Sequence, residues 1–227
     1  MSSPSARPPL RGEHAAGAAR PANRRAVVPP KQARSRESYE RVLRATDELL
    51  RERHFAEITV NDICIAADIS PSSLYGRFVT KDAVRATRYQ QHLGAAFEAL
   101  EGTLTRLREE TVELEELLRT MLGRFLQFCK DERHVIVSIW EDDVLREDYW
   151  RTGLEIEGAI TQAALDLLGA TDPEARRAVQ FGTRIAASSL QRATGVPVNF
   201  GERLGYGDDE IVERMTQMLA GYLRHVI

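Results

Sequence analysis

The sequence has little of what a disulfide-stapled or membrane-spanning protein needs. Its 227 residues include two cysteines, Cys64 and Cys129, which stand far apart and form no metal-binding or redox spacing. No apolar run approaches the ~18 residues of a membrane span, and no charged-then-apolar leader opens the chain. We therefore expect a cytoplasmic protein with no membrane partner, long enough for one large domain or two small ones.

The sequence also has little net charge, because 31 Lys and Arg residues nearly balance 34 Asp and Glu residues. The charge is nevertheless uneven along the chain. Residues 1–36 hold eight basic residues and one acidic residue, whereas residues 37–227 carry the acidic excess. A basic end on an acidic body indicates a polyanionic partner for that end.

Aromatic residues are missing from residues 1–33, which hold six of the nine prolines. Such a segment buries too little apolar surface to offset its ordering entropy, so we expect a disordered basic arm. Its basic residues can touch phosphate or the minor groove, namely Arg20, Arg24, Arg25 and Lys31. Because a charge run alone is weak evidence, the composition favours a merely solvated leader over this contact.

Period-two alternation, the mark of a half-buried strand, is lacking as well. From Ser35 onward apolar residues recur three and four apart, and the trio Val135 to Val137 is too short to be a strand in these surroundings. The prolines after residue 30 sit where helices tolerate them, at Pro71, Pro173 and Pro197. The sequence predicts an all-α fold.

Three helix starts lie close together between residues 59 and 82. Thr59 can cap one helix with Asp62 answering it, and Ser70 before Pro71 forms a second start. Thr80 can cap a third helix, with Asp82 in its first turn. Two short helices joined by a turn of three or four residues have the spacing of a helix-turn-helix.

Helices this short are marginal alone, so their apolar residues must pack on the preceding helix: Ile63, Ala66, Ile69, Leu74 and Phe78. The second short helix would then expose two serines, a phenol and a guanidinium, groups that donate to phosphate and read base edges. A helical linker with an accidental polar face is the alternative.

Residues 36–84 resemble the DNA-binding domain of TetR-family transcriptional regulators, above all in Leu74-Tyr75-x-x-Phe78-x-x-Lys81. The resemblance implies a helix-turn-helix domain at 34–84 and a helical effector-binding and dimerisation domain at 85–227. Arg77 would touch guanine or phosphate, Tyr75 and Lys81 would bind phosphates, and Thr59 would present free backbone N–H groups. The DNA-binding residues implied are Arg36, Thr59, Ser70, Ser72, Ser73, Tyr75, Arg77 and Lys81.

Two positions depart from the family pattern. Asp68 stands in the turn where glycine is usual, and Asp tolerates the left-handed conformation better than most residues. Gly76 is expected inside the recognition helix, where it weakens helix propensity by nearly ~1 kcal/mol relative to Ala. We therefore expect a recognition helix that becomes more ordered on DNA.

The larger C-terminal part carries no catalytic motif, and its scattered histidines have no zinc-binding spacing. The acidic residues at 141–143 and 147–148 favour a solvated turn over a cation site, because no glycine-containing calcium loop accompanies them. We expect no catalytic residue, no metal and no cofactor. A metal-dependent enzyme using this acidic cluster is the alternative.

Two features of this part indicate a dimer and a pocket. Small and apolar residues on the last two helices fit either a two-fold seam or intrachain packing, and the resemblance favours the seam: Gly182, Ile185, Ala186, Ser189, Met215, Met218 and Tyr222. Aromatic residues of the middle helices are more often core, with an effector pocket as the alternative. The pocket residues would be Phe125, Phe128, Trp140, Trp150, Leu154, Gln180 and Arg184.

The sequence as a whole thus predicts a homodimeric DNA-binding regulator that a small-molecule effector releases from a palindromic double-stranded operator. A repressor is favoured, with an activator left open. A helical protein-interaction adaptor without DNA binding is the alternative from another class.

Overall fold

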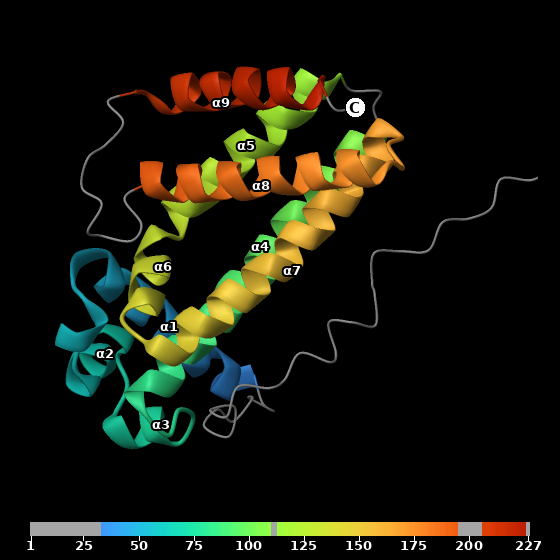
Figure 1. The fold of residues 1–227 in the computed structure, drawn as a ribbon. Helices are drawn as coiled ribbons and strands as arrows, with labels where there is room; N and C mark the ends of the chain where they lie inside the picture. The colour runs from blue at the N-terminus through green and yellow to red at the C-terminus, as the bar shows by residue number, and fades with distance from the viewer. Residues whose placement is uncertain (1–32, 110–112, 195–205, 226–227) are drawn as a thin grey trace, which may run out of the picture.

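The computed structural model describes residues 33–109, 113–194 and 206–225 of the chain. The predicted all-α fold is confirmed, and Figure 1 shows the helices. They are α1 (Ala33–Glu52), η3 (Phe55–Glu57), α2 (Val60–Ala67), α3 (Pro71–Tyr75), α4 (Lys81–Glu109), α5 (Leu114–Asp131), α6 (Arg133–Trp140), α7 (Asp143–Leu168), α8 (Pro173–Ala193) and α9 (Asp208–Leu223). The predicted basic arm lies outside the described residues, except for Ala33 at the start of α1.

The helix starts follow the expected capping chemistry. Thr59 Oγ1 accepts from the Asp62 backbone N–H at 3.1 Å, and Asp62 answers by accepting from the Thr59 N–H at 2.8 Å. Ser70 caps α3, and Thr80 Oγ1 accepts from Ala83 N–H at 3.1 Å as α4 begins. The Val135–Val137 trio lies within α6.

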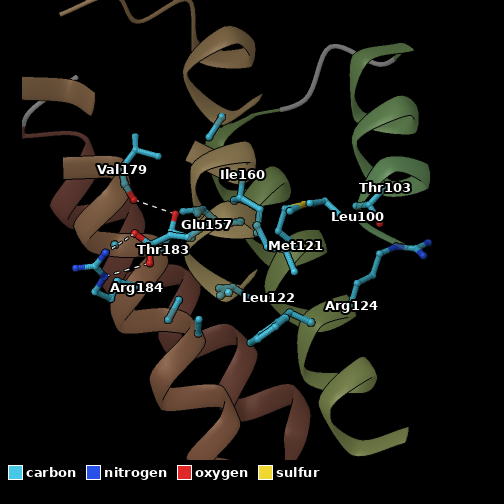
Figure 2. A pocket seen from close by; sticks show the side chains of 18 of the residues that line it. Leu100, Thr103, Met121, Leu122, Arg124, Glu157, Ile160, Val179, Thr183 and Arg184 are labelled. Carbon is cyan, nitrogen blue, oxygen red and sulfur yellow. Dashed lines mark hydrogen bonds and ion pairs between the residues drawn. The ribbon is translucent and has the colours of Figure 1, made fainter. Parts of the chain in front are cut away.

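The C-terminal helices form two contacting groups that enclose a shared interior. The long helices α4 and α7 contact each other, while α5 contacts α8 and α9, which run side by side (Figure 1). Helices α4, α5, α7 and α8 all contribute side chains to one internal cavity (Figure 2). Within the described residues every helix is too short or too polar to span a bilayer.

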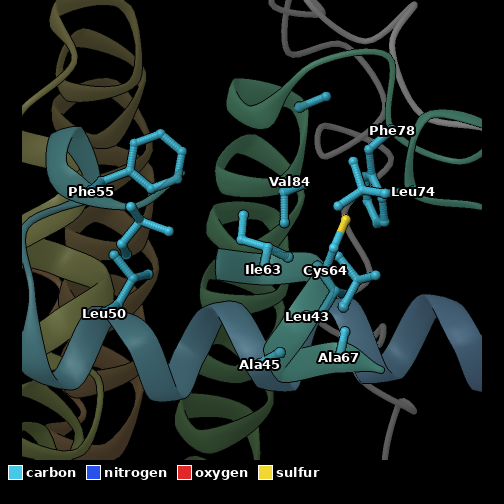
Figure 3. Packing of buried hydrophobic residues seen from close by; sticks show 13 residues of the cluster. Leu43, Ala45, Leu50, Phe55, Ile63, Cys64, Ala67, Leu74, Phe78 and Val84 are labelled. Atoms are coloured by element: carbon cyan, nitrogen blue, oxygen red, sulfur yellow. The ribbon is translucent and has the colours of Figure 1, made fainter. Parts of the chain in front are cut away.

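The N-terminal helices form a head with its own apolar core, drawn in Figure 3. Phe78 and Leu74 are fully buried against Val42 and Ile63, and the rings of Tyr39 and Phe78 stack at 5.1 Å between centroids. This packing holds the short helices α2 and α3, which are too short to be stable alone. Ala66, predicted to pack here, is exposed, and the neighbouring Ala67 is buried in its place.

Candidate nucleic-acid interface and ligand cavity

Helix α3 presents a small polar surface to solvent. Ser72 is exposed, Tyr75 is 51% exposed and Ser73 is half-buried. Leu74, between them, points into the head core and is fully buried. Because a single buried leucine anchors this five-residue helix, its hydroxyl-bearing face remains available for contact with a duplex.

The turn before α3 has the strained geometry expected at Asp68. This residue adopts φ 49° and ψ 56°, the left-handed conformation. Its N–H donates to carbonyls at the end of α2, which ends the helix and aims the chain toward Ser70. Asp replaces the usual glycine because its short polar side chain tolerates this conformation.

The end of α3 differs from the prediction. The helix stops at Tyr75, so Gly76 caps its C-terminus with φ −65° instead of lying inside it. Arg77 therefore lies beyond the helix, where its Nη1 donates to the Ser73 carbonyl at 2.6 Å and the side chain is half-buried. The guanidinium thus satisfies a carbonyl at the end of the helix, and it also lies beside the exposed hydroxyls.

The other predicted DNA contacts are spread over three helix starts. The capping box engages the backbone N–H groups of Thr59 and Asp62, so fewer N–H donors remain free for phosphate than expected. The Asp62 carboxylate lies beside these N–H groups. Lys81 Nζ donates to the carbonyls of Phe55 at 3.0 Å and Ile58 at 2.7 Å, which leaves one of its three donors for phosphate. Arg36 is exposed in α1.

The acidic turn after α6 docks the head against the rest of the chain. Glu141 Oε1 lies 2.7 Å from His54 Nδ1, and Asp142 Oδ2 accepts from Arg85 at 2.5 Å. Asp142 also caps α7 with its other oxygen. The expected solvated turn is confirmed for Asp143 and Glu147, which are exposed, whereas Glu141 and Asp142 bind His54 and Arg85, partners that the sequence pattern does not identify. Among the described residues no three His, Cys, Asp or Glu side chains gather as metal ligands would.

A second charged cluster joins the head to the middle helices. Arg88 of α4 donates from Nε to Asp47 Oδ1 at 2.6 Å, and from Nη2 to both Glu132 oxygens at 2.8 and 2.9 Å. His134 Nε2 also lies 2.8 Å from Asp47 Oδ1. Burial acts to raise the pKa of the Asp47 and Glu132 carboxyls, but the histidine and arginine contacts outweigh it and hold both pKa values below their usual range.

The cavity of about 350 Å³ is lined almost wholly by hydrocarbon. Figure 2 shows Met121 and Leu122 facing it from α5 and Ile160 from α7, with the Glu157–Arg184 ion pair at one edge. Five of the seven predicted pocket residues line it: Phe125, Phe128, Trp150, Leu154 and Arg184.

Trp140 and Gln180 do not line this cavity. Trp140 packs edge-on against Trp150, with ring centroids 5.6 Å apart. Gln180 lies on the outer side of α8, beside Phe181 in a shallow hollow, because neighbouring helical positions are turned by about 100°. The sequence reading missed the α4 wall, although its stripe of aliphatic and small residues was visible: Leu93, Ala96, Leu100 and Leu104.

The predicted dimer residues separate into two groups. Gly182 and Ala186 are buried within the chain, and an added Cβ on Gly182 would lie 3.3 Å from Leu219. Met215 packs on the same interior cluster, and Ser189 is half-buried. Ile185, Met218 and Tyr222 are exposed, together with Phe181, which the sequence reading missed.

Comparison with known proteins agrees with this geometry. Residues 42–86 match the sequence model described as bacterial regulatory proteins, tetR family. A search of curated protein sequences finds no match. A putative TetR-family transcriptional regulator from Mesorhizobium loti is similar in structure, with TM-score 0.68 and 12% identity over 86% of this chain and 98% of its own.

Two further solved structures share the fold at low identity. A TetR transcription regulator from Haloarcula marismortui aligns with TM-score 0.60 and 18% identity, over 84% of this chain and 98% of its own. GusR from Salmonella enterica aligns with TM-score 0.59 and 19% identity, over 82% and 95%. Regulators of this kind are DNA-binding transcription factors and not enzymes. The capped helix-turn-helix thus carries the DNA-binding domain of the TetR family of transcriptional regulators, and the helical body shares the fold of these solved structures.

Proposed function

We propose that this regulator is a ligand-released repressor that binds a palindromic operator as a homodimer in the cytoplasm. The head at 34–84 would read DNA and the part at 85–227 would bind the effector and the second copy. Ser72, Ser73 and Tyr75 would approach the groove with Arg77, while Lys81 would offer its remaining donor to phosphate. No cofactor enters this scheme.

The single observation that carries the proposal is the apolar cavity between the body helices. Its volume of about 350 Å³ lies within the range of small-molecule sites. Several polar groups on its wall are engaged within the chain: Thr103 and Thr183 donate to carbonyls on their own helices, and Tyr149 accepts from Gln191. A ligand would therefore meet mainly hydrocarbon, which supports an apolar effector.

An exposed apolar face supports the dimer. Phe181 and Ile185 on α8 adjoin Met218 and Tyr222 on α9, with the Phe181 and Tyr222 rings 5.9 Å apart. Large apolar side chains gathered on one surface favour association with another protein surface. A two-fold axis here would set the two copies of α3 about one DNA turn (~34 Å) or a multiple apart, which suits a palindromic site.

Release requires that the effector bind better to an arrangement that fits DNA poorly. The shift in operator affinity cannot exceed the difference between the effector's affinities for the two arrangements. The cavity is lined by α4, the helix that begins at Lys81 in the head. A ligand that displaces α4 therefore has a direct mechanical route to the DNA-reading surface.

Operator selection on the purified full chain tests the proposal. A random duplex library is expected to yield a palindromic consensus, bound by two copies per duplex and released by at least one apolar compound from a screen. Arg77→Ala should blur the consensus, whereas Arg106→Ala, an exposed arginine farther along α4, should leave it intact. Recovery of no consensus would contradict sequence-specific binding, and one copy per duplex would contradict the dimer.

A further inference from the structure

A chain of polar contacts runs from the wall of the cavity toward the head. It starts at His92, which lines the cavity from α4 and is only 2% exposed. Its Nδ1 lies 3.1 Å from Glu132 Oε2, and since a carboxylate can only accept, the proton is on Nδ1. The ring is walled by Phe128 and Tyr149, with centroids 5.0 and 6.1 Å away.

Glu132 stands at a junction between helices. It follows the last residue of α5 and precedes the first of α6, with φ −97° and ψ 10°. At such a junction one helix can tilt against the next without breaking its own hydrogen bonds. The same carboxylate accepts two hydrogen bonds from Arg88. A movement of Glu132 therefore displaces the Arg88 guanidinium or breaks these hydrogen bonds.

Arg88 completes the connection to the head. Its Nε donates to Asp47 on α1, the helix whose Val42 and Leu43 belong to the head core. Three other residues of the described body, His134, Glu141 and Asp142, also make polar contacts toward the head, and none of the three lines the cavity. Among the described polar contacts, the series His92, Glu132, Arg88, Asp47 is the route that begins in the cavity.

We propose that His92 is the cavity residue through which a bound effector acts on the DNA-binding head, with Glu132 and Arg88 as positioning residues. The inference rests on the proposed function and names how its ligand site is coupled to DNA. An occupant beside His92 displaces the ring, because Phe128 and Tyr149 leave it little room. Buried charges tolerate the loss of a partner poorly, so these contacts rearrange together and move α1 relative to α6.

An occupant added after folding tests this inference without knowledge of the natural effector. Ala96 lies one turn beyond His92 on α4 and lines the cavity. In Ala96→Cys the new thiol can react with benzyl methanethiosulfonate, which forms a mixed disulfide and releases methanesulfinate. Cys64 and Cys129 are buried, and burial raises the pKa of both thiols, so they react slowly. Mass spectrometry verifies a single adduct.

Operator affinity is then compared before labelling, after labelling and after reversal with dithiothreitol. We expect labelling to weaken binding at least about tenfold in Ala96→Cys, but less than about twofold when Glu132→Gln is also present. Each protein is its own reference, so a merely structural role of Glu132 would not change this ratio. Equal weakening in both backgrounds, or no weakening in Ala96→Cys, would overturn the inference.

Ala164→Cys serves as the matched control, because Ala164 lines the cavity from α7 near Leu165, well along the helix from Tyr149. Its labelled form should bind the operator within about twofold of its unlabelled form. If labelling at Ala164 weakens binding and labelling at Ala96 does not, the coupling through His92 is wrong while ligand release stands. If neither label nor any screened compound changes operator affinity, the release mechanism itself fails.

Discussion

At the scale of single residues, Lys81 illustrates how a predicted DNA contact can also support the fold. Its ammonium joins the carbonyls of Phe55 and Ile58 and lies 4.4 Å above the centre of the Phe55 ring. These contacts hold η3 against the start of α4. A side chain with this position can serve phosphate only with its third donor.

Lys81→Ala should therefore lower the free energy of unfolding by about 1 to 3 kcal/mol, because two carbonyls lose their donor. Urea unfolding followed by circular dichroism measures this change. Arg44→Ala, which removes an exposed arginine from α1, should stay within about 0.5 kcal/mol of the parent protein. Equal stability of the two variants would show that the Lys81 contacts contribute nothing.

Tyr75 and Arg77 should differ in what they contribute to DNA binding. Tyr75→Phe removes an exposed hydroxyl, so affinity should fall by the same factor for operator and random duplexes, with stability unchanged. Arg77→Ala should reduce the preference for operator by about 1 to 3 kcal/mol, because a guanidinium reads base edges. Titration of both duplexes at fixed salt checks this, and identical profiles would contradict the division.

The residues that sequence reasoning placed well are those governed by local chemistry. Thr59, Ser70 and Asp68 act through neighbours three or four positions away, and such spacings can be read from the chain. The partners of Lys81 and Arg77 are main-chain carbonyls. Every residue has such a carbonyl, so the residue types in a sequence do not identify these partners. Their inward contacts became visible only in the structure.

At the scale of helices, α8 and α9 show why a face is harder to assign than a helix. Both helices were expected from their periodicity, but each carries an inward row and an outward row, and apolar residues occur in both. Gly182 lets Leu219 approach within the chain, whereas Phe181, one position earlier, points outward. Periodicity identifies rows of apolar residues along a helix, but it does not tell which row packs against the chain's own core.

The outward row gives a direct prediction about assembly. Phe181→Glu places a charge on the exposed face of α8 and should raise the dissociation constant of the proposed dimer at least about tenfold, since a buried unpaired charge is costly. Sedimentation equilibrium measures the shift. Phe97→Glu, which changes an exposed phenylalanine of α4, should leave assembly unaltered. A monomer that persists for the parent protein at high concentration would contradict the interface.

At the scale of the whole molecule, ion pairs link the head to the body, and they make the free energy of unfolding depend on pH. The pKa values of Asp47 and Glu132 lie below their usual range in the folded protein. Their stabilisation is therefore present above the ordinary carboxyl pKa of about 4 and is lost as pH falls through the lower folded values.

Acidification from pH 6 to pH 3 should accordingly destabilise the parent protein more than Asp47→Asn, by about 1 kcal/mol. Urea unfolding at a series of pH values measures the difference. Asp143→Asn is the control, because the Asp143 side chain is 89% exposed and its removal should alter stability little. Parallel pH profiles for parent and Asp47→Asn would show that this carboxylate is not coupled to folding.

The architecture as a whole was largely predictable, whereas the docking of its parts was not. Missing alternation and repeated helical spacing predicted the all-α fold, and the capped cluster predicted the helix-turn-helix. The acidic residues Glu141 and Asp142 looked like a solvated turn, because their partners His54 and Arg85 lie 57 to 87 positions away in sequence. Long-range pairing of this kind has no periodic signature.

Helix α4 runs without a break from Lys81 to Glu109, from the head core to the wall of the cavity. At a rise of 1.5 Å per residue its length is roughly 40 Å, so a tilt of about 5° at one end swings the other by about 3 to 4 Å. In a symmetric pair the two swings add, to roughly a fifth of the ~34 Å repeat of the double helix. In the proposed dimer, a small displacement of α4 at the apolar cavity would therefore become a spacing mismatch at the two half-sites of the operator.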